Sequence, residues 1–117
     1  IIVLDFWATW CAPCVAELPH LKAVYEKFSK RDDFVLISVS LDDDEEALRA
    51  FIAKRKLNWH HVFGESGGAQ KAAHRYGVEG LPSLFVIGPD GKIIGRDWYG
   101  PELVKKIEQV LEDHDTT

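Results

Sequence analysis

Short apolar runs alternate with longer amphipathic stretches along the 117-residue chain, and this alternation predicts most of its secondary structure. A short, nearly uninterrupted apolar run is typical of a strand that is buried on both faces. A stretch whose apolar residues recur every three or four positions is typical of a helix that packs one face on a core. The runs predict strands at Ile1–Phe6, Phe34–Leu41, Trp59–Phe63, Ser83–Ile87 and Lys92–Tyr99.

The amphipathic stretches predict four helices. The longest covers residues 12–30 and contains Pro19, which removes a backbone donor and clashes with the preceding turn, so we predict a kink near Val15–Pro19. A second helix is predicted to start in the acidic run Asp42–Glu46, because carboxylates are stabilised at helix N-termini, and this interpretation is preferred to a metal site. The other two helices are predicted at Ala69–Tyr76 and from about Pro101 onward.

A turn signal near the end of the chain sets the direction of the last two strands. Gly88-Pro89-Asp90-Gly91 contains the Asp-Gly dipeptide that favours a tight hairpin, so the flanking strands are predicted to be antiparallel. The resulting order βαβαβαββα implies an α/β fold, in which a central mixed sheet is flanked by helices on both faces and joined by right-handed crossovers. At this length we expect residues 1–117 to form a single domain.

The composition is that of a soluble globular domain. Apolar residues make up 46% of the chain and charged residues 28%, which argues against disorder. The net charge of −5 and the scattered Lys and Arg residues argue against a nucleic-acid partner, and no apolar run approaches the roughly 20 residues of a membrane-spanning helix. The chain begins at Ile1 with neither an initiator Met nor a signal-peptide pattern, so we expect a fragment whose targeting segment lies elsewhere.

The only two cysteines, Cys11 and Cys14, lie where the first strand gives way to the first helix. Residues three apart in a first helical turn share one face, and their Cα atoms lie within the range that a disulfide bridges. The helix N-terminus favours an anion, so we predict that the Cys11 thiol ionises readily and is the nucleophile. Cys14 is predicted to resolve the mixed disulfide that Cys11 forms, while Pro13 fixes the backbone between the two sulfurs.

Two alternatives to a redox pair remain at this point, a zinc half-site and two inert core thiols. A structural zinc site needs four ligands, and the sequence has no second cysteine pair, so no metal is expected. Inert thiols would be more typical of a mid-strand position than of a helix start beside Trp10. The histidines are expected at the surface without a catalytic role: His20, His60, His61, His74 and His114.

The segment Asp5–Cys14 reads Asp-Phe-Trp-Ala-Thr-Trp-Cys-Ala-Pro-Cys and resembles the active-site segment of the thioredoxin superfamily. Pro19 matches the proline inside the family's first helix, and Tyr76–Ser83 resembles the segment that ends in the family's cis-proline. Residues from about 42 to 66 have no counterpart in a minimal thioredoxin. This helix-and-strand insert, together with Glu17-Leu18-Pro19, resembles the TlpA/ResA branch of membrane-anchored or secreted bacterial thiol–disulfide oxidoreductases.

The resemblance implies roles for further residues. Pro82 matches the cis-proline, which would hold an extended substrate backbone beside the sulfurs. Asp5 matches the buried acid of ordinary thioredoxins, and Glu17 matches a carboxylate of ResA-like proteins, although a solvated helix carboxylate is the alternative for Glu17. A buried carboxylate resists ionisation, so either acid could exchange a proton with Cys14. Trp10 is expected to cover the sulfurs and to offer an apolar surface to partners.

The leading hypothesis is an enzyme, a thiol–disulfide oxidoreductase that reduces disulfides of other proteins and needs no cofactor. The resemblance implies partners with protein thiols or disulfides, an upstream redox partner, a monomeric domain and a location outside the cytoplasm, in an anchored or secreted full-length protein. A thiol peroxidase is an alternative, although its Thr-x-x-Cys signature has Cys11 at the Thr position. A metallochaperone that holds Cu(I) or zinc through Cys11 and Cys14 is the other, although the chain has no Met and no evident third ligand.

Overall fold

The helices and strands follow the predicted order. The computed structural model describes residues 1–64 and 67–116, so the end of the predicted insert, residues 65 and 66, lies outside the described part. Within the described residues the elements are β1 (Ile2–Trp7), α1 (Ala12–Phe28), β2 (Val35–Ser40), α2 (Glu45–Arg55), β3 (His60–Phe63), α3 (Gly68–Arg75), β4 (Ser83–Ile87), β5 (Ile93–Arg96) and α4 (Glu102–Asp115).

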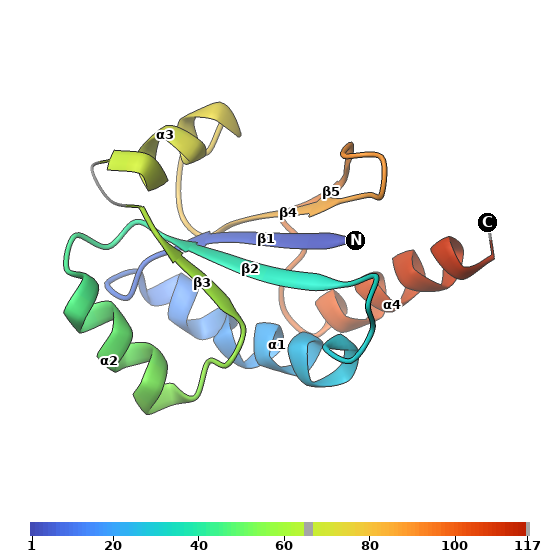
Figure 1. Ribbon diagram of the computed structural model, residues 1–117, viewed down its shortest axis with the longest axis horizontal. Coiled ribbons are helices and arrows are strands. Elements are labelled where there is room, and N and C mark those ends of the chain that lie inside the picture. Colours follow the sequence, from blue (N-terminus) through green and yellow to red (C-terminus); the bar gives the residue numbers. More distant parts are fainter. Residues whose placement is uncertain (65–66, 117) are drawn as a thin grey trace.

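The strands form one mixed sheet in the order β3-β2-β1-β4-β5 (Figure 1). β1 pairs with β2 in parallel and β2 pairs with β3 in parallel, whereas β4 is antiparallel to both β1 and β5. The predicted mixed sheet and the predicted antiparallel hairpin are therefore confirmed. The insert contributes α2 and β3, and β3 forms one edge of the sheet.

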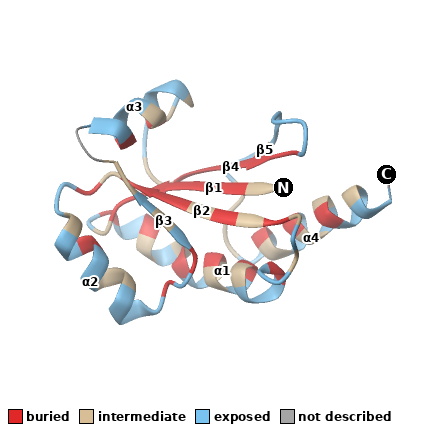
Figure 2. Cartoon of the chain, viewed as in Figure 1, coloured by how far each residue is buried: buried red, intermediate tan, exposed pale blue. Residues whose placement is uncertain are grey.

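Alternate residues of the central strand β1 face two different apolar layers, as the two-residue period of a strand requires. Val3 and Trp7 belong to a large cluster with buried residues of α1, α2 and α4, while Leu4 and Phe6 belong to a smaller cluster with α3. Figure 1 shows α1, α2 and α4 on one side of the sheet and α3 on the other. Figure 2 shows that the buried parts of these helices face the sheet, so the prediction of helices on both faces is confirmed.

Local chemistry explains where several helices begin and end. The Asp44 side chain accepts a hydrogen bond from Ala47 N at 3.1 Å and caps α2, which confirms the acidic run as a helix start. Gly77 follows α3 with a φ of +70°, a backbone conformation that favours glycine. α1 continues through Pro19 to Phe28, and the kink expected there stays a prediction. Among the described residues, no helix combines the length and the apolar character that crossing a membrane requires.

The last strand is shorter than predicted, because β5 ends at Arg96 and not at Tyr99. Asp97 takes a φ of +55°, its N–H donates to Leu84 O at 2.7 Å, and its carboxylate accepts from Leu84 N at 3.0 Å. Asp97 therefore pairs with β4 once more but turns the chain out of strand geometry. The prediction of a strand through Tyr99 was wrong because the apolar pattern gives no sign of this turn.

We predict that Ile107→Ala lowers the free energy of unfolding by about 2–5 kcal/mol, because Ile107 is fully buried where α4 meets the large apolar cluster. Urea unfolding followed by circular dichroism measures the change. Lys105→Ala on the exposed side of the same helix is the control and should cost less than about 0.5 kcal/mol. Equal losses in the two variants would contradict this packing.

Candidate redox site

Cys11 and Cys14 form a disulfide at the N-terminus of α1. Their Cα atoms are 5.3 Å apart, and Cys11 is the N-cap residue, whose sulfur accepts a hydrogen bond from Cys14 N at 3.3 Å. Pro13 lies between them in the first turn. Cys11 is 7% exposed and Cys14 is 2% exposed, so Cys11 is the more accessible residue of the pair. The position and proximity of the pair agree with the sequence-based prediction.

An apolar groove lies beside the disulfide-bearing loop. Trp10, directly before Cys11, is 69% exposed and borders a groove of about 320 Å³. The other walls come from Leu41, from α3 and from the segment 78–81, which leads to Pro82. The Leu81–Pro82 peptide bond is cis, as the resemblance implied. Trp10 and the cis-proline segment therefore meet at one surface.

Asp5 is buried on the face of the sheet that α1 covers. It lies between Val3 and Trp7 in the strand's alternation, both of which belong to the same apolar cluster as the two cysteines. The Ser38 hydroxyl on the neighbouring strand donates to Asp5 Oδ2 at 3.1 Å. Burial raises the pKa of Asp5 from its ordinary 3.8 to about 7, the Ser38 hydrogen bond lowers it, and the Glu17 charge raises it. Asp5 therefore changes its protonation near neutral pH.

Glu17 has a specific partner and is not the solvated helix carboxylate that was the alternative. Its side chain is half-buried, and Oε2 accepts a hydrogen bond from Gly100 N at 2.9 Å. This contact joins α1 to the loop before α4, a separation of 83 residues. The Glu17 charge also raises the pKa of Asp5, so Glu17 lies close enough to influence that buried carboxyl group.

Tyr99 is a residue of the site that the sequence did not reveal. Its hydroxyl oxygen lies 2.8 Å from both Pro82 O and Asp97 Oδ1, and these two acceptors share its single proton. Burial raises the pKa of Tyr99 above its ordinary value, as do the hydrogen bond to Asp97 and the charges of Asp97, Asp5 and Glu17. Tyr99 thus remains a protonated donor and ties the cis-proline segment to the loop before α4. The hydrophobic pattern had placed this tyrosine in a strand, and no local motif signals its role.

Asp42 anchors the loop that carries Cys11, which the sequence also did not reveal. Thr9 N donates to both Asp42 oxygens at 3.1 and 3.2 Å, and Thr9 Oγ1 donates to Oδ1 at 2.6 Å. The Ser40 hydroxyl donates to Asp42 Oδ2 at 2.5 Å. Asp42 is 8% exposed and fully engaged. It was grouped with the acidic helix start, but α2 is capped by Asp44 and Asp42 turns to the active-site loop instead.

Three of the five histidines expected at the surface are half-buried: His20, His61 and His114. His61 is half-buried, with its ring centroid 6.1 Å from that of Trp7 and 5.2 Å from that of Trp59. Burial lowers the pKa of His61, so it is neutral at physiological pH. The His60-His61 dipeptide gives no sign that the second ring packs between two tryptophans. In the described part of the chain, no three His, Cys, Asp or Glu side chains gather in a way that could hold a metal ion.

With this geometry in view, comparison with known proteins identifies the family. Residues 1–93 match a family model described as thioredoxin-like. The chain belongs to the thioredoxin-like family. The resemblance of the sequence to the thioredoxin superfamily is therefore confirmed over most of the chain.

Individual relatives of this thioredoxin-like chain are thiol–disulfide oxidoreductases. It is 31% identical to the thiol–disulfide oxidoreductase ResA of Bacillus thuringiensis subsp. konkukian, over 95% of this chain and 61% of that protein. A thiol–disulfide oxidoreductase from Bacteroides fragilis is 33% identical, with a TM-score of 0.84 over 93% of this chain and 80% of that one. The thioredoxin domain of a Bacteroides vulgatus thiol–disulfide oxidoreductase is 28% identical, with a TM-score of 0.86 over 93% of this chain and 77% of that one.

These likenesses confirm a thiol–disulfide oxidoreductase domain of TlpA/ResA type. They do not favour the thiol peroxidase or the thiolate metal-binding module that the sequence left open. The chain spans 61% of the length of the curated ResA relative, so the activity, substrates and partners of the whole protein are matters of proposal.

We predict that Asp42→Asn lowers the free energy of unfolding by about 1–3 kcal/mol, because the donors from Thr9 and Ser40 lose a charged acceptor. Urea unfolding of the oxidised protein measures the loss. Asp43→Asn, an exposed neighbour, is the matched control and should change stability by less than about 0.5 kcal/mol. A neutral Asp42→Asn would show that the loop is not held in this way.

The raised pKa of Asp5 predicts that stability falls as the pH rises. The folded protein binds the Asp5 proton more tightly than the unfolded chain does. This proton therefore contributes fully to the free energy of unfolding below pH 3.8, and its contribution declines until about pH 7. The difference between 3.8 and about 7 corresponds to about 4 kcal/mol. We expect Asp5→Asn to remove this decline.

Urea unfolding of the oxidised protein and of Asp5→Asn at about pH 4 and about pH 8 measures this effect. Every other titrating group cancels in the difference between the two proteins. The free energy of unfolding of Asp5→Asn minus that of the wild type should be larger at the higher pH than at the lower pH. A difference that stays constant would contradict the assignment of a proton to buried Asp5.

Proposed function

We propose that this protein reduces disulfides in other proteins, with Cys11 and Cys14 as its redox pair. The observation that carries the proposal is the disulfide at the N-terminus of α1, in which Cys11 is the more exposed residue. A helix N-terminus stabilises an anion, which favours the Cys11 thiolate in the reduced protein. The Cys14 N–H that points at the Cys11 sulfur adds a donor to that thiolate.

The reaction we propose transfers two electrons from the dithiol to a substrate disulfide. The Cys11 thiolate attacks one substrate sulfur, the substrate S–S bond breaks, and the other substrate sulfur leaves as a thiolate. Cys14 then loses its proton and attacks the Cys11 sulfur of the mixed disulfide. The second substrate thiolate leaves, and the Cys11–Cys14 disulfide remains. An upstream dithiol partner returns the pair to the reduced state.

Asp5 is the proposed acceptor for the Cys14 proton. The Asp5 carboxyl group and Cys14 belong to the same buried layer between β1 and α1, and a pKa of about 7 suits a base that works near neutral pH. Glu17 and Tyr99 support this role indirectly. Glu17 raises the proton affinity of Asp5, and Tyr99 holds the Pro82 segment through its hydroxyl.

The groove beside Trp10 is the proposed docking surface for the substrate chain. It is lined mainly by apolar side chains, and it runs from the exposed indole of Trp10 to Leu81 at the cis-proline. Pro82 has no N–H of its own and is proposed to hold an extended substrate segment beside the sulfurs. Pro13 is proposed to fix the geometry of the redox turn. Binding through backbone and apolar contacts would suit several protein substrates.

The remaining proposals concern the whole protein. We place the domain, residues 1–117, outside the cytoplasm as a monomeric unit of an anchored or secreted protein, on the strength of its likeness to ResA. The same likeness supports a reducing direction and an upstream redox partner. The domain uses no cofactor in this scheme, because the two cysteines carry both electrons.

We predict that Cys14→Ser accumulates a mixed disulfide with a protein substrate, because the second attack is missing, whereas Cys11→Ser accumulates none. The reduced variants are mixed with a disulfide-containing protein such as insulin and separated on non-reducing gels. Both variants lack the internal disulfide, so each controls for the stability of the other. Mixed disulfides formed mainly through Cys14 would overturn the assigned order.

We predict that Asp5→Asn slows release of the substrate by on the order of a hundredfold, the lower range for a positioned base. The wild-type rate should rise as the pH increases to about 7, because Asp5 loses its proton over this range. The rate of the variant should show no such rise. Stopped-flow kinetics of mixed-disulfide resolution measures both rates. An unchanged pH profile in Asp5→Asn would remove Asp5 from the proton transfer.

A further inference from the structure

A buried chain of two hydrogen bonds connects the insert to Asp5. Trp59 Nε1 donates to Ser38 Oγ at 2.8 Å, and Ser38 Oγ donates to Asp5 Oδ2 at 3.1 Å. Ser38 is fully buried and Trp59 is 6% exposed. The indole N–H is only a donor, so the Ser38 oxygen must accept from it. The single hydroxyl proton of Ser38 is thereby left to point at Asp5.

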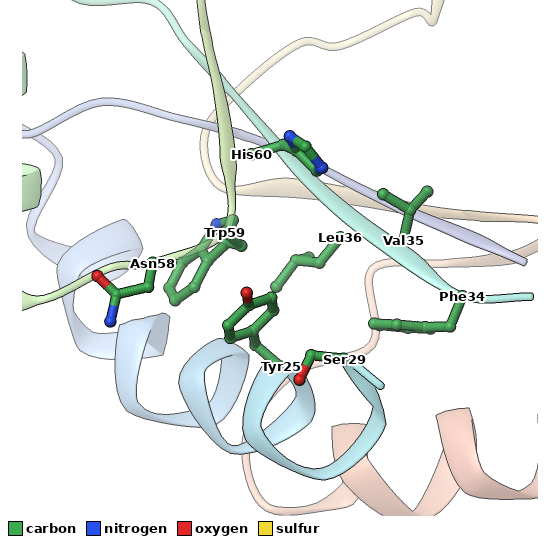
Figure 3. A pocket seen from close by; sticks show the side chains of 8 residues that line it. All are labelled: Tyr25, Ser29, Phe34, Val35, Leu36, Asn58, Trp59 and His60. Carbon is green, nitrogen blue, oxygen red and sulfur yellow. The ribbon is translucent and has the colours of Figure 1, made fainter. Parts of the chain in front are cut away.

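Packing holds the Trp59 ring in the position that this chain requires. Trp59 directly precedes β3, and its ring centroid lies 5.2 Å from that of His61 and 6.0 Å from that of Tyr25. Figure 3 shows Trp59 and Tyr25 beside a cavity, whose volume is about 240 Å³. The ring therefore borders open space on this side, and a smaller phenyl ring fits at position 59 without overpacking.

We propose that Trp59 is a positioning residue of the redox site, whose indole N–H orients the Ser38 hydroxyl toward the Asp5 carboxyl group. Trp59 contacts neither sulfur and acts through Ser38. It belongs to the helix-and-strand insert, so the insert contributes to the chemistry of the site as well as to the edge of the sheet. The inference deepens the proposed function and rests on it only for the consequence in thiol–disulfide exchange.

The physical effect of this relay is to oppose the burial of Asp5. The Ser38 hydrogen bond stabilises the carboxylate and lowers its pKa, against burial and against the charge of Glu17, which raise it. Tyr99 also lies near enough to feel the Asp5 charge and presents a protonated hydroxyl. Without the Trp59 donor, the Ser38 hydroxyl rotates freely, the carboxylate loses part of its stabilisation, and the pKa of Asp5 rises.

The test is a double-mutant cycle on the pKa of Asp5 in the oxidised protein, where neither cysteine titrates. The carboxyl ¹³C resonance of Asp5 is followed against pH in the wild type, Trp59→Phe, Ser38→Ala and the double variant. We expect each single variant to raise the pKa by about half to one pH unit, from the usual energy of one hydrogen bond. The double variant should match Ser38→Ala, because Trp59 acts only through Ser38.

Phe34→Leu is the matched control. Phe34 borders the same cavity as Trp59 but makes no hydrogen bond to Ser38, so this variant should leave the pKa of Asp5 unchanged. A pKa in Trp59→Phe equal to that of the wild type, or a further rise when Trp59→Phe is added to Ser38→Ala, would overturn the relay. A rise in Phe34→Leu equal to that in Trp59→Phe would also overturn it, because general loosening of the core would then explain both.

A second measurement needs no substitution. In the wild type, the Trp59 indole N–H resonance should titrate with the same midpoint as the Asp5 carboxyl group. Protonation of Asp5 weakens the hydrogen bond that the Ser38 hydroxyl donates to it, and this changes the oxygen that the indole N–H contacts. An indole resonance that ignores the Asp5 titration would contradict the relay. These readouts use the oxidised protein and no substrate. Loss of mixed-disulfide trapping would refute the proposed function alone, and a failed cycle would refute the relay alone.

Discussion

A carboxyl group buried in an apolar layer is the constraint on which the site depends. Asp5 lies on the central strand between Val3 and Trp7, and burial keeps its pKa near 7. A charged group at this position costs stability unless neighbours compensate. Ser38 supplies part of that compensation, while Glu17 opposes it. The protein thus keeps a carboxyl group with a pKa of about 7 in the layer that α1 covers, at the expense of the stability of the folded state.

Four segments that are distant in sequence hold the surroundings of this carboxyl group. Asp42 pins the loop before Cys11, Tyr99 pins the cis-proline segment, and Glu17 joins α1 to the loop before α4. Trp59, which belongs to the insert, donates a hydrogen bond to Ser38. Each contact is a hydrogen bond to a partly or fully buried group, where an unpaired donor or acceptor is costly. The redox turn is consequently fixed from several sides, while Trp10 remains free at the surface.

The sequence predicted what depends on local pattern, and it missed what depends on contacts between distant residues. Apolar runs located the five strands, and the position of Cys11 and Cys14 at a strand-to-helix junction located the redox pair. The end of β5 was wrong because a single positive φ at Asp97 leaves no trace in hydropathy. The roles of Asp42 and Tyr99 were missed for a related reason, since their partners lie 33 and 17 residues away along the chain. The cis bond before Pro82 came from the family resemblance, because local sequence carries little information about it.

The most direct test of the central claim is the redox equilibrium of the Cys11–Cys14 pair. The protein is equilibrated in glutathione or dithiothreitol buffers of graded potential, its thiols are trapped, and the reduced fraction is measured by mass spectrometry. If the protein is a reductase, the pair should show one reversible two-electron transition near the thioredoxin value of about −270 mV. A potential near −120 mV would instead indicate a disulfide-forming oxidant. The absence of any reversible two-electron transition would contradict the proposed function altogether.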